Sequence, residues 1–212
     1  MFSGIVEEIG RIERAQQTAS GRRVTIACQT ALEGTRIGDS IAVDGVCLTV
    51  AARSPSSFAA DIQPVTARRS TLGDTRPGSQ VNLERSVVAG GRIGGHYVQG
   101  HVDGIGRIVG KRGEGTALVV EIAASHDVLR YAVERGFIAV DGASLTVVAL
   151  GPDRLVVSLV SHTQQHLTLP QLPLGAAVNL EADVIAKYVE RLITPHRSEG
   201  FTLETLVRAG FV

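Results

Sequence analysis

The sequence predicts an all-β protein built from two copies of one domain. Short runs rich in Val and Ile alternate with Gly, Pro, Asp and Ser, a composition typical of strands joined by tight turns. The ten residues IAVDGVCLTV at 41–50 return as IAVDGASLTV at 138–147, with eight of the ten letters unchanged. Strands this short and frequent suit a small closed barrel or a sandwich, and their periodicity alone does not separate the two.

The repeat extends through most of the chain. VNLER at 81–85 returns as VNLEA at 178–182, an interval of 97 residues, and GIVEEIGRI at 4–12 returns as GHVDGIGRI at 100–108, an interval of 96. One residue is therefore inserted between the two blocks. Two long copies indicate duplicated domains rather than a solenoid of short units. We expect one lobe at about 1–89 and a second at about 90–186.

Strands are predicted in the first lobe by β-branched runs bounded by turn residues. These runs are VTIAC at 24–28, SIAV at 40–43, CLTVAA at 47–52, FAADI at 58–62 and QVNLE at 80–84. An Asp-Gly pair separates two such runs in each lobe, at 44–45 and at 141–142. Because Asp-Gly suits the positive φ angles of a tight hairpin turn, each pair predicts a hairpin.

An amphipathic helix is predicted where the repeat ends, over 183–193. Its apolar side chains fall on one stripe, formed by Val184, Ile185, Tyr188, Val189 and Leu192. Asp183 is a suitable N-cap, and Pro195 opposes continuation of the helix. The apolar stripe needs a partner, which is either its own lobe or another subunit. We expect the segment 202–211 to be one more short helix or a frayed tail.

Composition argues against several classes of protein. Lys+Arg and Asp+Glu both number 21, so no basic surplus indicates nucleic-acid binding. No apolar run approaches the roughly 20 residues of a membrane helix, and the first residues lack the pattern of a signal peptide. The two cysteines, Cys28 and Cys47, form no disulfide framework, which favours a reducing compartment and hence the cytoplasm.

The most unusual segment is GGHYVQGHVDG at 94–104, which contains His96 and His101. Two histidines five residues apart on a strand point to opposite faces, and no Cys or carboxylate cluster joins them, so no metal site is expected. The segment is either a glycine-rich linker with incidental histidines or a place where a histidine transfers protons beside a ligand. His101 is favoured for the second role because its counterpart in the repeat is the apolar Ile5.

Cys47 and Ser144 occupy one position of the repeat, and Thr49 and Thr146 follow two residues later on the same strand face. A lone Cys on a strand is usually a small core residue. Replacement by Ser is unusual in a core, so a polar pocket wall is the alternative. No spacing typical of a hydrolase triad accompanies these residues. Asp183 is either a helix cap or a functional carboxylate.

Six motifs together resemble one family. MFSGIVEEIGRI, VDGVCLTV, NLER, GGHYVQGHVDG, VDGASLTV and DVIAKYVERL occur in this order over about residues 1–193, as in the trimeric, alpha-chain type of riboflavin synthase. The resemblance implies two six-stranded antiparallel Greek-key barrels, followed over 187–212 by a trimerisation helix and tail. It implies conversion of two 6,7-dimethyl-8-ribityllumazine molecules to riboflavin and 5-amino-6-ribitylaminouracil, without cofactor or metal. It also makes lumazine synthase a candidate partner.

The resemblance also implies site residues, in a site shared between the N-terminal barrel of one subunit and the C-terminal barrel of another. The positions implicated in catalysis are Phe2, Ser40, Cys47, His101, Ser144, Thr146 and Asp183. The expected wall of the N-terminal pocket is Gly4, Ile5, Val6, Cys47, Leu48, Thr49, Asp61, Ile62, Gln63, Pro64, Val65 and Thr66. The expected wall of the C-terminal pocket is Gly100, His101, Val102, Ser144, Leu145, Thr146, Val160, Ser161, His162, Thr163, Gln164 and Gln165. Arg135 completes the binding residues. Of these, we expect His101 to transfer protons, and Ser144 or Cys47 to activate or orient a ring.

The chain departs from the family pattern at several of these positions. Arg135 stands where Lys is usual, and Val65 replaces a Glu. Ser161 begins a stretch in which the family has Pro, and Asp44 stands where Asn is common. The alternative function is therefore a non-catalytic lumazine or flavin carrier, or a specialised paralogue; a third reading is a structural β-duplicate without ligand. The two Gly-His pairs at 95–96 and 100–101 favour the enzyme, because carriers on this fold tend to lose them.

Overall fold

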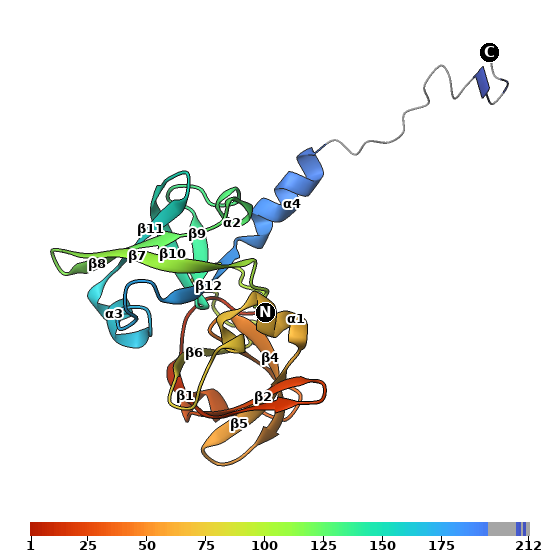
Figure 1. The fold of residues 1–212 in the computed structure, drawn as a ribbon, viewed down its shortest axis with the longest axis vertical. Helices are drawn as coiled ribbons and strands as arrows, with labels where there is room; N and C mark the ends of the chain where they lie inside the picture. The colour runs from red at the N-terminus through yellow and green to blue at the C-terminus, as the bar shows by residue number, and fades with distance from the viewer. Residues whose placement is uncertain (195–206, 209, 211–212) are drawn as a thin grey trace.

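The computed structural model describes residues 1–194, 207–208 and 210, and shows two barrels, one above the other in Figure 1. The strands of the first barrel are β1 (Glu8–Thr18), β2 (Gly21–Ala27), β3 (Ser40–Val43), β4 (Val46–Arg53), β5 (Ser57–Ile62) and β6 (Gln80–Arg85). Those of the second are β7 (Gly104–Glu114), β8 (Ala117–Ala123), β9 (Phe137–Val140), β10 (Ala143–Leu150), β11 (Arg154–Leu159) and β12 (Ala177–Ala182). The helices are α1 (Pro64–Arg69), α2 (His126–Leu129), α3 (Ser161–His166) and α4 (Val184–Ile193), with 3₁₀ turns η1 (Thr30–Leu32) and η2 (Thr71–Gly73).

Both sheets close on themselves, which confirms the barrel and excludes the sandwich. The strand order is β1-β2-β5-β4-β3-β6 in the first barrel, and the second follows the equivalent order through β7 to β12. Strands β3, β4 and β5 form a meander and β2 lies beside β5, which is Greek-key topology. All the pairs are antiparallel, and β1 and β6 close the ring over Glu8–Arg11 and Gln80–Leu83.

Each barrel encloses its own apolar core. Ile26, Phe58 and Leu83 are fully buried in the first, and Ile122 and Leu155 in the second. The register shifts at the equivalent place in the first strand of each barrel, after Ile12 in β1 and after Ile108 in β7. A bulge bends a strand and increases its twist, so these shifts help each sheet to curl and close.

The two Asp-Gly turns have the predicted geometry. Asp44 and Asp141 have φ angles of 45° and 44°, and Gly45 and Gly142 have 75° and 80°. The turns also touch each other: a Cβ on Gly45 would lie 2.6 Å from the backbone nitrogen of Gly142. The repeated Asp-Gly therefore forms the point at which the two barrels meet, and no side chain fits between them.

Two buried asparagines tie these turns together across the barrels. The side-chain amide of Asn82 donates to the Asp141 carbonyl at 2.9 Å, and that of Asn179 donates to the Asp44 carbonyl at 2.8 Å. Within each barrel, the Asn backbone N–H donates to the Asp side chain at 2.7 Å. The Asn82 Oδ1 also accepts from the backbone of Thr168. A buried polar network satisfied in this way fixes one docking geometry.

Helix α4 begins as predicted and projects away from the second barrel (Figure 1). The Asp183 carboxylate caps it by accepting from the Ile185 backbone N–H at 3.0 Å. Lys187 pairs with Asp103 of the second barrel at 2.6 Å, which ties the helix to its own barrel. The apolar stripe is nevertheless exposed, with Leu192 83% accessible. Pro195 and the segment 202–206 lie outside the described residues, and none of the described helices has the length and apolarity to cross a bilayer.

We predict that Asp44→Asn raises stability at alkaline pH. Burial raises the pKa of the Asp44 carboxyl to about 7, from a usual value of 3.8, while the Asn82 N–H opposes the rise. Burial and then the charge of Asp44 hold the pKa of Asp141 well above its usual range. A carboxyl whose pKa is higher in the folded than in the unfolded protein lowers the free energy of unfolding as the pH rises from about 4 to about 7. An Asn side chain at position 44 still has an oxygen that can accept from the Asn82 N–H, but it carries no group that titrates.

The measurement is urea unfolding at pH 5 and pH 8. We expect Asp44→Asn to raise the free energy of unfolding at pH 8 by about 1–3 kcal/mol over the original chain, with a smaller difference at pH 5. Asp74→Asn is the control, because Asp74 is an exposed carboxylate. Parallel pH profiles for Asp44→Asn and the original chain would contradict the prediction.

Candidate functional site

The segments that precede β1 and β7 cross between the barrels, and we call them arm 1 (residues 1–6) and arm 2 (residues 97–102). Phe2 and Val98 form an isolated antiparallel bridge, with hydrogen bonds of 2.7 and 3.1 Å in the two directions. Both side chains are fully buried, in a cluster with Ala42 and Ala139 that Cys47 packs against. Phe2 is therefore a core residue at the crossing of the arms.

A buried glutamate at the same repeat position holds each arm to its own barrel. Glu84 in β6 accepts from the backbone N–H groups of Ser3 and Gly4 at 2.7 and 3.0 Å. Glu181 in β12 accepts from Gln99, Gly100 and His101, at 2.7 to 2.9 Å. Burial raises the pKa of both carboxyls, and the amide hydrogen bonds oppose that rise. These glutamates act as fixed acceptors for backbone amides.

Each arm then lies against the opposite barrel. The carbonyl of Gly4 accepts from the Ser144 N–H at 2.8 Å, and that of Gly100 accepts from the Cys47 N–H at 2.9 Å. A Cβ added to Gly4 would lie 2.5 Å from the Ser144 Cβ, and a Cβ added to Gly100 would lie 2.6 Å from the Cys47 Cβ. Only glycine permits this approach, and both have positive φ angles, 76° and 82°. The expected grouping is therefore wrong: residues 4–6 lie with Ser144, and residues 100–102 lie with Cys47.

The cavity beside arm 2 has a volume of about 360 Å³, and we call it the N-terminal half-site. Its lining is Val46, Cys47, Val65, Thr66, Arg69, Ser70, Gly100, His101 and Val102. Six of the site residues named from the sequence meet here. Cys47 is half-buried rather than enclosed in the barrel, and His101 is exposed. The cavity thus offers a thiol, hydroxyls, an imidazole and a guanidinium beside apolar side chains.

Other residues expected around this pocket lie elsewhere. Leu48 and Ile62 point into the barrel core. Asp61 forms a two-point ion pair with Arg23 on the barrel surface, at 2.7 and 2.6 Å. Gln63 and Pro64 begin α1, whose next residues Val65 and Thr66 reach the cavity.

The equivalent surface beside arm 1 is the C-terminal half-site, which we define as Gly4, Ile5, Val6, Ser144, His162 and Thr163. Val6 packs against the core of the second barrel, as Val102 packs against that of the first. His162 takes the place of Val65, and His166 takes that of Arg69. Their rings lie 4.2 Å apart between centroids, and His166 Nδ1 lies 2.7 Å from the His162 carbonyl oxygen.

Several residues expected here serve the barrel itself. The Gln164 side chain donates to the carbonyls of Thr116 and Leu159, and Ser161 also donates to Thr116. Leu145 is buried in the core. Val160 is the exposed residue before α3, and Gln165 is exposed on that helix.

Ser144 has a histidine neighbour, and it is His96. The His96 Nδ1 lies 2.7 Å from the Ser144 Oγ, and the imidazole stacks on Phe137 with ring centroids 5.3 Å apart. His96 is only 6% exposed. Burial lowers the pKa of its imidazole, and the charge of Asp183 opposes that effect. Sequence reasoning gave no role to His96. The backbone approaches Ser144 closely here, since a Cβ on Gly95 would lie 2.5 Å from the Ser144 Oγ, and this approach depends on the docking of the barrels.

The remaining expected residues lie around these half-sites. Thr146 is exposed on β10, paired with Phe137, and Ser40 pairs with Thr49 on the equivalent strands. Arg135 has a φ angle of 67° in the turn before β9, and its N–H donates to the Val147 carbonyl at 2.7 Å. It does not line the N-terminal half-site.

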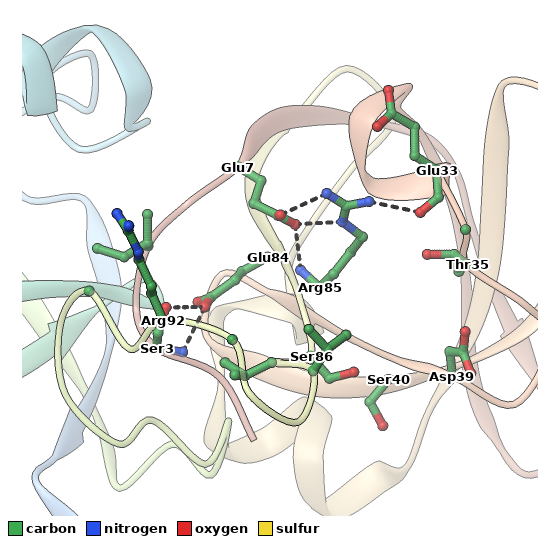
Figure 2. A pocket seen from close by; sticks show the side chains of 16 residues that line it. Ser3, Glu7, Glu33, Thr35, Asp39, Ser40, Glu84, Arg85, Ser86 and Arg92 are labelled. Atoms are coloured by element: carbon green, nitrogen blue, oxygen red, sulfur yellow. Dashed lines mark hydrogen bonds and ion pairs between the residues drawn. The ribbon is translucent and has the colours of Figure 1, made fainter.

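A larger cleft of about 640 Å³ lies beside the first barrel and includes Ser3, Ile5 and Ser40 (Figure 2). Several of its charged groups already have partners. Arg85 forms a two-point ion pair with Glu7 at 2.9 and 2.8 Å and donates to the Glu33 carbonyl at 2.7 Å. Size alone therefore does not make this cleft the reactive site.

We predict that Gly100→Ala damages the fold locally whereas Gly113→Ala does not. The alanine Cβ at position 100 would clash with Cys47, and the residue would have to keep a positive φ angle. Together these effects should lower the free energy of unfolding by at least about 2 kcal/mol. Gly113 is a strand glycine with open space around it, so it is the matched control. Chemical unfolding measures both changes. Equal stability of the two variants would mean that the close approach of Gly100 to Cys47 does not contribute to the stability of the fold.

Comparison with known proteins agrees with this architecture. The model of the lumazine binding domain family matches residues 3–86 and again 99–183. Riboflavin synthase of Mycobacterium bovis is 48% identical over 204 residues, which cover 94% of this chain and 100% of that protein. Riboflavin synthase of Bacillus subtilis is 39% identical over 210 residues, covering 99% of this chain and 97% of that protein.

Solved structures show the same fold. LumP complexed with riboflavin has a TM-score of 0.80, and LumP complexed with 6,7-dimethyl-8-(1'-D-ribityl) lumazine has a TM-score of 0.78. Each is 24% identical and covers 86% of this chain and 99% of LumP, so this likeness concerns the fold alone. The sequence matches run through both barrels and through almost the full length of the relatives. The chain belongs to the riboflavin synthase family of transferase enzymes and carries two lumazine binding domains.

Proposed function

We propose that the protein converts two molecules of 6,7-dimethyl-8-ribityllumazine to riboflavin and 5-amino-6-ribitylaminouracil by transfer of a four-carbon unit. One observation carries the proposal: the two half-sites share one backbone geometry but differ in their reactive side chains. Cys47 and Ser144 occupy equivalent positions of the repeat, and so do His101 and Ile5. Two similar pockets suit two copies of one substrate, and their differences suit the unequal roles of donor and acceptor.

The chemistry requires a base and a group that adds to a ring. The protons of the lumazine 7-methyl group are acidic because the carbanion delocalises into the ring. Histidine is the side chain suited to remove such a proton near neutral pH, and general base help is typically worth about 10²–10⁴-fold. We assign this role to His101, which is exposed at the N-terminal half-site. Ser144 or Cys47 then activates or orients the second ring at C7.

A homotrimer would bring two half-sites of different subunits together. Helix α4 exposes Ile185, Tyr188, Val189 and Leu192, an apolar surface that its own barrel does not cover. We therefore propose that α4 assembles the trimer, with the N-terminal half-site of one subunit facing the C-terminal half-site of another. Association with lumazine synthase and a cytoplasmic location stay predictions.

The second candidate is a carrier that binds lumazine or flavin without turnover. It is favoured by two departures from the family pattern, because Val65 replaces a Glu in α1 and Ser161 stands where the family has Pro at the start of α3. Against it stand His96 and His101, of which one contacts Ser144 and the other lines the N-terminal half-site. These contacts favour the enzyme.

We predict steady formation of riboflavin when the purified protein is mixed with 6,7-dimethyl-8-ribityllumazine alone at neutral pH. One riboflavin should form for every two lumazines consumed, as followed by absorbance and chromatography. His101→Ala should lower kcat about 10²-fold while the fold is retained. His126→Ala is the control, because His126 is an exposed histidine outside both half-sites. Tight binding without product would favour the carrier, and full turnover of His101→Ala would exclude His101 as the base.

We predict that the double variant Val189→Asp/Leu192→Asp is monomeric and inactive. Two carboxylates on the apolar stripe would be buried without partners in an assembled trimer, which is strongly unfavourable. Arg191→Ala is the control, because Arg191 is exposed on the same helix outside that stripe. Sedimentation velocity measures the assembly. A trimeric double variant would show that another surface assembles the protein.

A further inference from the structure

Two exposed histidines lie one turn apart on α3, at the edge of the C-terminal half-site. His162 and His166 are four positions apart, a spacing that makes two side chains neighbours on the surface of a helix. Their ring centroids lie 4.2 Å apart, with 32° between the ring planes. The first barrel has no such pair, because Val65 and Arg69 occupy the equivalent positions of α1. The histidine pair therefore distinguishes one half-site from the other.

A contact with the backbone fixes which ring nitrogen of His166 is available. Its Nδ1 lies 2.7 Å from the His162 carbonyl oxygen, and a carbonyl oxygen can only accept a hydrogen bond. Nδ1 therefore carries the hydrogen, and the free lone pair of the neutral ring is on Nε2. Histidines that bind metals are usually held in this way, with the other ring nitrogen donating to a carbonyl or a carboxylate. His166 thus has the tautomer of a metal ligand before any ion is present.

Helix α3 is short, but it is anchored on the side away from the solvent. The Gln164 side chain, between the two histidines in sequence, donates to the carbonyl oxygens of Thr116 and Leu159 at 2.9 and 2.8 Å. Leu167, directly after the helix, is buried in the core of the second barrel. Both imidazoles are exposed. The backbone therefore holds the pair at a fixed spacing, while the side chains are free to turn toward a shared ion.

The donor atoms select the kind of ion. Imidazole nitrogens suit Zn²⁺, Ni²⁺ and Cu²⁺, whereas Mg²⁺ and Ca²⁺ require oxygen ligands. In the described part of the chain, no group of three or more His, Cys, Asp and Glu side chains is placed to enclose a metal. Two protein ligands leave the other coordination positions to water, so an ion on this pair would be open to solvent and easily removed.

We propose that His162 and His166 bind one late transition-metal ion, and that the bound ion reversibly blocks the C-terminal half-site. The ligands are the Nε2 atom of His166 and one ring nitrogen of His162. The inhibitory part of this inference rests on the proposed function. His162 belongs to the same half-site as Ser144 and Thr163, so a hydrated ion on the pair occupies space beside the position of the lumazine. The metal would thus act on one of the two substrate positions and leave the N-terminal half-site open.

Calorimetric titration with Ni²⁺ tests the binding site without turnover, in protein that carries no histidine tag. The tightest site should bind one Ni²⁺ per chain. His162→Gln and His166→Gln should each weaken it about 10²-fold, because each variant loses the second, intramolecular ligand. His126→Gln is the matched control, since His126 is an exposed histidine on α2, and it should bind like the unmodified protein. Unchanged Ni²⁺ affinity in His166→Gln would overturn the proposal.

Nitrogen NMR of the imidazole rings identifies the ligands directly. Zn²⁺ should shift the ring nitrogens of His162 and His166 together and leave those of His126 where they are. A shift of the His101 ring alone would place the ion in the N-terminal half-site and overturn the proposal.

Riboflavin formation tests the inhibition. Zn²⁺ at a saturating concentration should remove most of the turnover of the unmodified protein, and EDTA should restore it. His166→Gln should keep its own metal-free rate when the same Zn²⁺ is added. An equal loss in that variant, or full turnover of the unmodified protein with the pair occupied, would overturn the inhibitory role. Absence of riboflavin formation without metal would refute the proposed function instead, and the Ni²⁺ titration would still decide whether the pair binds an ion.

Discussion

The contact between the two Asp-Gly turns is the constraint on which the site depends. Gly45 and Gly142 meet backbone to backbone, and the crossed hydrogen bonds of Asn82 and Asn179 permit only one docking of the barrels. Because each turn is continuous with β4 or β10, this docking also fixes where Cys47 and Ser144 lie. Substituting either glycine would separate the barrels and displace both half-sites together.

The crossing of the arms is a second consequence of this docking. Each arm is tied by a buried glutamate to its own barrel but delivers a glycine to the other, so each half-site contains residues from both lobes. Neither lobe has a complete half-site by itself. Each copy therefore supplies part of the other copy's pocket.

The fold was largely predictable from the sequence because strand patterns and turns are local. The repeated block at 41–50 and 138–147 predicted the duplication, and Asp-Gly predicted the positive φ angles. Closure into a barrel needs β1 to pair with β6, some 70 residues away, and strand periodicity does not encode that pairing. The docking of the two barrels likewise depends on contacts between residues far apart in the sequence. The sequence therefore grouped the arms with the wrong barrels and gave no sign that the buried His96 would lie beside Ser144.

Buried carboxylates and reactive groups have separate roles in this architecture. Asp44, Asp141, Glu84 and Glu181 are all buried, and each accepts hydrogen bonds from backbone N–H groups. Their burial costs stability, as their raised pKa values indicate, and it is offset by the fixed backbone geometry that they provide. That geometry is nearly the same in both halves. The chemistry can therefore diverge at Cys47 and Ser144 without disturbing the frame, and duplication yields two different environments from one backbone.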